Sequence, residues 1–184
     1  MTAPTKNYKG PSFVKLDLGI RKEYLTAAMC KGEPTHERGS IHCYELRNSY
    51  RVFHPKVYDI LRPEFMYWVN IPMRIIPHWD IFSTATLNVY AEPNDAKTSF
   101  WRINDNATPS NGGYNVVNNI YELEDLTYLD SFIANSGDSY LLNVSRVHTV
   151  DLARDKQRSM IQFGWTSKSY DEISALAQKH FPAT

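Results

Sequence analysis

The sequence predicts a mainly β protein with a few peripheral helices. Apolar runs of strand length recur along the chain, and turn signals rich in glycine, asparagine and proline separate them. Histidine, aspartate and arginine residues stand at the edges of such runs, where a sandwich or barrel can bring them together. The 184 residues suffice to bury the core of one domain and are few for two. We therefore expect a single domain.

The first 66 residues predict elements that support a core from outside. Residues 13–18 alternate like an edge strand, and residues 22–29 contain helix formers with few breakers. Residues 40–62 mix aromatic and aliphatic side chains, which favour packing on the outside of a barrel over binding a substrate. We accordingly expect residues 1–66 to support a β core at 67–166, with a C-terminal helix at 167–184.

The first polar cluster is His78 and Asp80, at the end of a strand-like run that begins at Tyr67. Side chains two positions apart in a strand point to the same side, so His78 and Asp80 would share one face and Trp79 the other. With six histidines and twenty acidic residues in the chain, a lone His-x-Asp triplet is a weak signal. Its position at a strand end gives it weight.

The second cluster contains His148 and Arg158. His148 is expected to end a strand-like run that starts at Ser139, and another run, residues 159–165, begins directly after Arg158. Two neutral imidazoles and one carboxylate on one face of Fe(II) leave the opposite positions open for other ligands. A planar, permanently charged guanidinium suits the carboxylate of an acidic co-substrate. Arg146 and Arg154 are the alternative arginines for that role.

Several short segments follow one another in a definite order. They are His78–Asp80, Leu87–Tyr90, Thr98–Trp101, Gly137–Asp138 with Leu141–Asn143, Val147–Val150 and Arg158–Ser159. In this order and spacing, residues 75 to 165 resemble the double-stranded β-helix core of the Fe(II)/2-oxoglutarate-dependent dioxygenases, and in particular their small stand-alone members from bacteriophage and marine microbial genomes. One position departs from the pattern: Met160 stands where some members have serine. No hydroxyl partner for a carboxylate is expected there.

The resemblance implies a jelly-roll, cupin-like core and an oxidative enzyme. Fe(II) would be held by His78, Asp80 and His148, with 2-oxoglutarate and O₂ as co-substrates. Arg158 would bind the distal carboxylate of 2-oxoglutarate, and Asn88 and Tyr90, on one strand face, would add hydrogen bonds. The implied reaction is hydroxylation of an unactivated C–H bond with release of succinate and CO₂. The alternative is a cupin-like metal-binding barrel with a non-oxidative or purely structural role, against which Arg158 is the main argument.

Composition gives no sign of a nucleic-acid or membrane partner. Lysine and arginine together number 20, as do aspartate and glutamate, so the clustered positive charge typical of such surfaces is not indicated. No transmembrane run or secretion signal is recognisable, and we expect a cytoplasmic enzyme whose cysteines, Cys30 and Cys43, are free thiols. The substrate would be a small molecule or a peptidyl side chain.

Two further segments carry predictions. Residues 102–119 are rich in asparagine, with Pro109 and a glycine pair, which predicts a loop that acts as a lid or specificity segment near the metal. Ser169 precedes Glu172 at capping-box spacing, and Ile173, Leu176 and Ala177 supply an apolar face. A short helix is therefore expected at the C-terminus.

Overall fold

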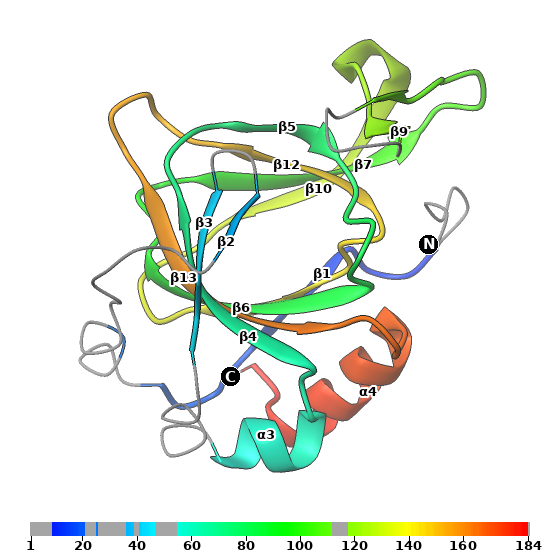
Figure 1. Ribbon diagram of the computed structural model, residues 1–184. Coiled ribbons are helices and arrows are strands. Elements are labelled where there is room, and N and C mark those ends of the chain that lie inside the picture. Colours follow the sequence, from blue (N-terminus) through cyan, green and yellow to red (C-terminus); the bar gives the residue numbers. More distant parts are fainter. Residues whose placement is uncertain are drawn as a thin grey trace.

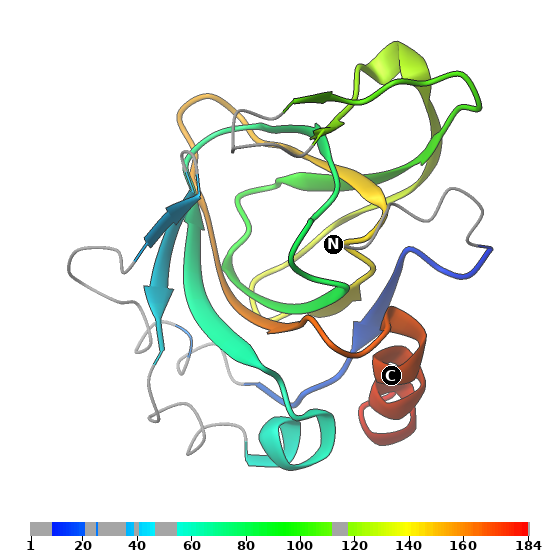
Figure 2. The same cartoon turned by 45° about the vertical axis from the view of Figure 1, so that its right-hand side comes forward.

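Two facing antiparallel sheets build the protein (Figures 1 and 2). The computed structural model describes residues 9–20, 25, 36–38, 41–46, 55–111 and 118–183. From edge to edge, the larger sheet contains β1 (Phe13–Leu16), β11 (Ser139–Leu142), β6 (Ala85–Glu92), β13 (Arg158–Trp165), β4 (Phe65–Ile71), β3 (Ile41–Glu45) and β2 (His36–Arg38). The smaller sheet contains β10 (Leu126–Ile133), β7 (Lys97–Ile103), β12 (Val147–Asp151), β5 (Ile75–His78), β9 (Asn118–Ile120) and β8 (Ser110–Asn111).

The order of the strands is that of a jelly roll. From β4 onward the chain crosses from one sheet to the other at almost every connection, and only the β7 to β10 connection, with its insertion, returns to the same sheet. The insertion contains β8, β9 and a 3-10 turn, η1 (Leu123–Asp125). The predicted fold class, mainly β with a jelly-roll core and peripheral helices, is confirmed.

Two helices cover the outer face of the larger sheet, α3 (Pro55–Leu61) and α4 (Tyr170–His180) (Figure 1). Outward side chains of β6 and β13 pack with the buried faces of both helices in one cluster, because their apolar surface is removed from water on that side. The cluster includes Leu87, Val89, Ile161, Phe163, Trp165, Val57, Leu61, Ile173 and Ala177.

The C-terminal helix begins as predicted. The Ser169 hydroxyl accepts a hydrogen bond from the Glu172 backbone N–H, and the Glu172 carboxylate accepts one from the Ser169 backbone N–H. This reciprocal pair satisfies two N–H groups that the first turn of a helix leaves without intrahelical partners.

A second apolar cluster lies between the sheets and receives side chains from both. Val69, Tyr90 and Met160 come from the larger sheet, and Phe100 and Phe132 come from the smaller one. Because alternate residues of a strand point to opposite faces, β13 contributes to both clusters.

Three predicted runs differ from the observed strands. The run starting at Tyr67 is two strands in opposite sheets, since Pro72 has no N–H for the ladder and β4 ends at Ile71. His148 does not end the run from Ser139 but belongs to β12, after a turn in which the Arg146 N–H bonds to the Asn143 carbonyl.

The third difference concerns residues 102–119, which were expected to form a loop throughout. β7 continues to Ile103, and the short strands β8 and β9 pair within this segment. Sheet pairing gives their backbone N–H and C=O groups partners that a solvent-exposed loop would find in water.

The N-terminal region follows the prediction in part. β1 is an edge strand as expected but ends at Leu16, before the expected end. Tyr44, Tyr58 and Leu61 pack in the outer cluster, whereas Cys43 on β3 turns toward the space between the sheets. The helix expected at residues 22–29 and Cys30 lie outside the described residues, apart from Leu25. None of the helices in the described ranges is long and apolar enough to cross a membrane.

Candidate metal centre

Three predicted ligands meet between the two sheets. His78 is the last residue of β5 and lies directly opposite His148 of β12, with ring centroids 4.4 Å apart. The Nε2 atoms of His78 and His148 lie 3.4 Å and 4.0 Å from Oδ1 of Asp80. One potential ligand atom from each residue falls within 4.8 Å of the others, so together they could hold a metal ion.

Asp80 reaches this position by a route that differs from the sequence prediction. β5 ends at His78, so Asp80 does not share a strand face with it. The chain leaves the sheet, and the Asp80 N–H bonds to the Val144 carbonyl at 2.9 Å. The pairing of β5 with β12 is also irregular between His78 and Ile75, as in a β-bulge, a feature that re-aims side chains near functional sites. Trp79 packs away from the site among Ile103, Tyr121 and other apolar residues.

Main-chain carbonyl groups orient both imidazoles. Nδ1 of His78 lies 2.9 Å from the carbonyl oxygen of Ile76, and Nδ1 of His148 lies 3.0 Å from that of Arg146. A carbonyl oxygen only accepts, so in each ring Nδ1 carries the proton and donates it. Nε2 is then the unprotonated nitrogen on the Asp80 side, as a metal ligand requires.

The two imidazoles differ in their electrostatic surroundings. Burial, reinforced by the neighbouring His78, lowers the pKa of His148 to about 4, so its ring is neutral at pH 7. Burial also opposes protonation of His78, but the hydrogen bond that a protonated Nε2 donates to Asp80 and the charge of that carboxylate together raise the pKa of His78 above the ordinary value. A positive charge is therefore stabilised next to the Asp80 carboxylate, where the two Nε2 atoms converge.

Arg158 is buried between the sheets, and no acidic residue of the described ranges pairs with it. Its exposed fraction is 1%, and its Nη1 donates to the Thr98 hydroxyl at 2.7 Å. The guanidinium carbon lies 4.3 Å from the centre of the Tyr90 ring. Nε donates no hydrogen bond, and within the described ranges no carboxylate forms an ion pair with this side chain. A buried charge is costly unless it is paired, so the arrangement fits an anionic ligand.

Thr98 is a partner that the sequence did not reveal. It lies on β7 of the smaller sheet, whereas Arg158 lies on the larger one. The segment Thr98–Trp101 belonged to the recognised pattern, but nothing in it indicated that the threonine would face the arginine. Thr98 thus places a hydroxyl beside the guanidinium that Met160 does not provide.

Asn88 and Tyr90 share the inner face of β6, as expected from their spacing. Both are buried, and Nδ2 of Asn88 donates to the Tyr90 hydroxyl at 3.4 Å. Oδ1 of Asn88 accepts from Nε2 of Gln162 at 3.4 Å. A polar chain therefore runs from Gln162, which the sequence did not single out, to Arg158.

The alternative arginines lie elsewhere. Nη1 of Arg146, which is also buried, donates to the Ser12 hydroxyl at 2.7 Å. Arg154 is exposed in the turn before β13. Of the three, Arg158 is the one that lies over Tyr90 on the inner face.

The segment inserted between β7 and β10 lies beside the metal ligands. Ile120 of β9 is paired with His78, and the Tyr121 N–H bonds to the Pro77 carbonyl at 3.0 Å (Figure 1). The end of β9, one residue beyond the predicted segment 102–119, is therefore next to the candidate centre, and the role of that segment as a lid or specificity loop stays a prediction.

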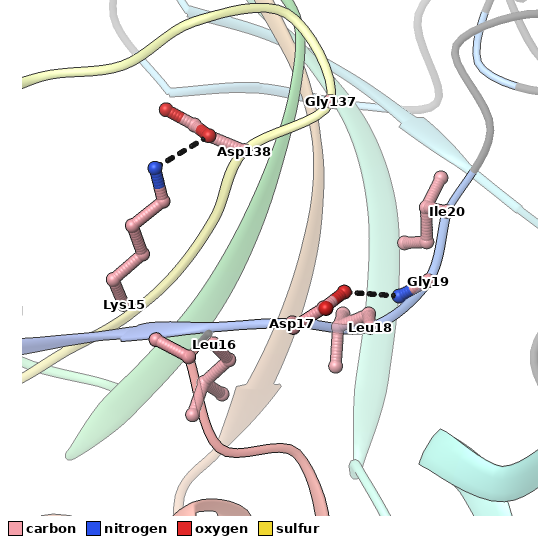
Figure 3. A pocket seen from close by; sticks show the side chains of 9 residues that line it. Lys15, Leu16, Asp17, Leu18, Gly19, Ile20, Gly137 and Asp138 are labelled. Carbon is pink, nitrogen blue, oxygen red and sulfur yellow. Dashed lines mark hydrogen bonds and ion pairs between the residues drawn. The ribbon is translucent and has the colours of Figure 1, made fainter.

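A separate pocket of about 290 Å³ lies at the edge strand β1 (Figure 3). Lys15 forms an ion pair of 2.8 Å with Asp138 at its wall, and Asp17 accepts a hydrogen bond from the Gly19 N–H. None of the candidate site residues lines this pocket.

Comparisons with known proteins agree on the fold. No protein-family model and no curated protein matches the sequence. Among solved structures, the non-heme α-ketoglutarate-dependent epimerase SnoN from nogalamycin biosynthesis is 12% identical, with a TM-score of 0.54; the match covers 86% of this chain and 83% of that one. The non-heme α-ketoglutarate-dependent carbocyclase SnoK from the same biosynthesis is 12% identical, with a TM-score of 0.52 and coverage of 83% and 78%. Hazelnut vicilin also matches, at 11% identity and a TM-score of 0.39, and the chain spans only 32% of its length.

Proposed function

We propose that this protein is an Fe(II)- and 2-oxoglutarate-dependent dioxygenase that hydroxylates an unactivated C–H bond of a small-molecule or peptidyl substrate in the cytoplasm. The observation that carries the proposal is the buried Arg158, which pairs with no carboxylate among the described residues and shares the space between the sheets with the His78, Asp80 and His148 group. Similarity of fold to SnoN and SnoK, both described as α-ketoglutarate-dependent, supports it.

The donor set suits Fe(II). Two imidazole Nε2 atoms and one carboxylate oxygen converge from one side, which corresponds to the two-histidine, one-carboxylate set of non-heme iron oxygenases. The backbone carbonyls that fix both Nδ1–H groups orient the ligands before any metal binds. His78, Asp80 and His148 would therefore hold the ion.

Arg158 and Thr98 would bind the distal carboxylate of 2-oxoglutarate. The guanidinium offers its Nε–H, and the Thr98 hydroxyl lies beside it, so a carboxylate can receive charge-assisted hydrogen bonds there. The Tyr90 ring holds the guanidinium in place, and Asn88 holds the Tyr90 hydroxyl. When bound, Fe(II) would supply the activation of O₂ coupled to decarboxylation of 2-oxoglutarate to succinate and CO₂.

The surrounding side chains would keep water away from the reacting groups. Phe100, which is fully buried, lies 6.0 Å from the His148 ring, and Met160 and Tyr90 are buried on the opposite sheet. Such an apolar lining strengthens the electrostatic interactions inside and limits side reactions with solvent.

The proposal is tested by adding Fe(II) and 2-oxoglutarate without oxygen and recording the visible spectrum. We expect a weak metal-to-ligand charge-transfer band, followed by succinate release once O₂ is admitted. Arg158→Ala should require much more 2-oxoglutarate for the same band, whereas Arg154→Ala, which removes an exposed arginine, should behave like the parent. A protein that binds Fe(II) but gives neither band nor succinate would instead be a non-oxidative metal-binding barrel.

A further inference from the structure

The middle strand of the larger sheet has one residue that solvent reaches, and it points inward. Every residue of β13 is buried except Gln162, which is partly exposed. Its neighbours Ile161 and Phe163 point outward and are covered by the cluster that contains residues of α3 and α4. Solvent therefore reaches Gln162 from the space between the sheets, and not through the outer face.

Two aromatic residues on β4 are partly exposed on the same inner face. Tyr67 is directly opposite Gln162, and Phe65 is opposite Gly164. The tip of the Phe65 ring lies against Gly164, where an added Cβ would be 1.8 Å from ring carbon Cζ. The Phe65 and Tyr67 ring centres are 5.4 Å apart. We call Phe65, Tyr67 and Gln162 the amide wall.

The wall has unused hydrogen-bonding capacity of a defined kind. Gln162 makes one hydrogen bond to another described residue, from Nε2 to Oδ1 of Asn88. Its Oε1 and its second N–H have no partner in the described part of the chain. The hydrogen bond to Asn88 orients the Gln162 amide plane, and Asn88 is itself bonded to the Tyr90 hydroxyl. The Oε1 acceptor and the second N–H donor of Gln162 are therefore presented side by side.

Charge restricts what can bind there. Among the inner positions of β4 and β13, and at Thr86, Asn88 and Tyr90 of β6, Arg158 is the sole charged side chain, and it is fully buried. On β3 the exposed Glu45 is directly opposite Tyr67. Within the described residues, a negatively charged group beside the wall would therefore lie near the carboxylate of Glu45.

Resting on the proposed function, we infer that the amide wall recognises the substrate through a flat, uncharged group with adjacent N–H and C=O, such as a carboxamide, a lactam or a pyrimidine edge. Gln162 pairs with that edge, and Phe65 and Tyr67 contact its face. The wall is linked through Asn88 and Tyr90 to Arg158, so a group bound on it would lie on the inner face of the sheet that also carries the proposed co-substrate arginine. Gln162 is thus a specificity residue, and Asn88 is a positioning residue.

The first experiment uses metal-free protein, so that its result does not depend on iron chemistry. Ligand-observed NMR titration with benzamide, which has the donor and acceptor edge, is compared with N,N-dimethylbenzamide, which lacks the N–H. We expect benzamide to bind more tightly by about five-fold or more, the usual worth of a hydrogen bond. Gln162→Met should remove this preference. Gln157→Met, which changes an exposed glutamine before β13, should retain it.

Equal binding of the two compounds to the parent protein would overturn the inference, as would an unchanged preference in folded Gln162→Met. If that variant does not fold, the comparison of the two compounds on the parent decides. A second measurement separates this inference from the proposed function: benzamide should perturb the charge-transfer band of the Fe(II) and 2-oxoglutarate complex. Selective benzamide binding without any band leaves the wall as a binding site and rejects the oxygenase. A band without benzamide binding retains the oxygenase and rejects the wall.

Discussion

The two faces of β13 have opposite compositions although they belong to the same eight residues. The outward side chains, Ile161, Phe163 and Trp165, are fully buried against the outer cluster. The inward side chains include Arg158, which donates to Thr98 of the facing sheet, and Gln162, which donates to Asn88 of the neighbouring β6. Because alternate residues of β13 point to opposite faces, the outward side chains stabilise the fold and the inward ones face the proposed ligand site. Substitutions of adjacent residues should therefore have effects of different kinds.

The largest effect is expected on the inner side, at the metal ligands. His78→Ala or His148→Ala should fold but lose iron binding almost completely, because two remaining protein ligands are too few to hold a labile divalent ion. Iron content after gel filtration measures the loss. His180→Ala, at the exposed end of α4, is the matched control and should bind iron like the parent. Full iron content in either folded site variant would refute the ligand assignment.

On the outer side, Phe163→Ala should lower the free energy of unfolding by about 3–5 kcal/mol, the range for removal of a buried aromatic side chain. Phe163 is fully buried in the outer cluster. Gln162→Ala, one residue earlier, should cost about 1 kcal/mol, since it removes one long hydrogen bond from a partly exposed side chain. Denaturant unfolding compares the two. Equal losses would contradict the division between the faces.

Arg158 tests whether an inward residue can be lost without loss of stability. Arg158→Ala should raise the KM for 2-oxoglutarate ten-fold or more, because a charge-assisted pair is worth about 1.5–3 kcal/mol. Arg158→Met should unfold at the same denaturant concentration as the parent or a higher one, since it replaces a buried charge that lacks an acidic partner. Steady-state kinetics and denaturant unfolding measure the two effects. A larger KM change in Arg154→Ala than in Arg158→Ala would show that Arg154, and not Arg158, binds the co-substrate.

The smallest effect is expected at Glu64, which lies outside both faces and joins the start of β4 to the end of β13. Its carboxylate accepts hydrogen bonds from the backbone N–H groups of Thr166 and Ser167 at 3.0 Å and 3.1 Å. Burial would raise the pKa, but hydrogen bonds from Ser167 and Thr166 outweigh it and lower the pKa to about 2.

A lowered pKa means that the native state favours the ionised form. The contribution is therefore present above the ordinary value of about 4.5 and is lost as the pH falls toward 2. Glu64→Gln should cost less than about 1 kcal/mol at pH 7, because the carboxylate is exposed. Unfolding measured at pH 7 and at pH 2.5 should show the difference from the parent shrinking. A difference that grows with acidity would contradict this assignment.

The local parts of the site could be read from the sequence, and the contacts between sheets could not. His78 and Asp80 are two residues apart, and Arg158 begins a recognisable strand. The meeting of Arg158 with Thr98, however, depends on how the larger sheet faces the smaller one, which no spacing within either strand encodes. Gln162 was likewise unremarkable in sequence, because its significance comes from being the one partly exposed residue of an otherwise buried strand.

The strand boundaries show a similar limit. Residues 67–76 look like one apolar run, and only Pro72 signals that the chain leaves one sheet and enters the other. The same crossing brings His78 opposite His148. Asp80 was expected to join them through strand alternation but does so from outside the strand, because its N–H is held by the carbonyl of Val144. The three candidate ligands could be named from the sequence, but the backbone course that brings them together could not.

The anchoring of both imidazoles by carbonyls two residues earlier in the chain has a consequence for how this site can evolve. The tautomer of each ring is fixed by a backbone carbonyl and not by another side chain. Replacing the side chains at positions 76 and 146 leaves the carbonyl groups where they are, so ligand geometry is inherited with the backbone trace. Substitutions in the surrounding sheets can then change which substrate fits between them without changing the geometry of the two histidine ligands.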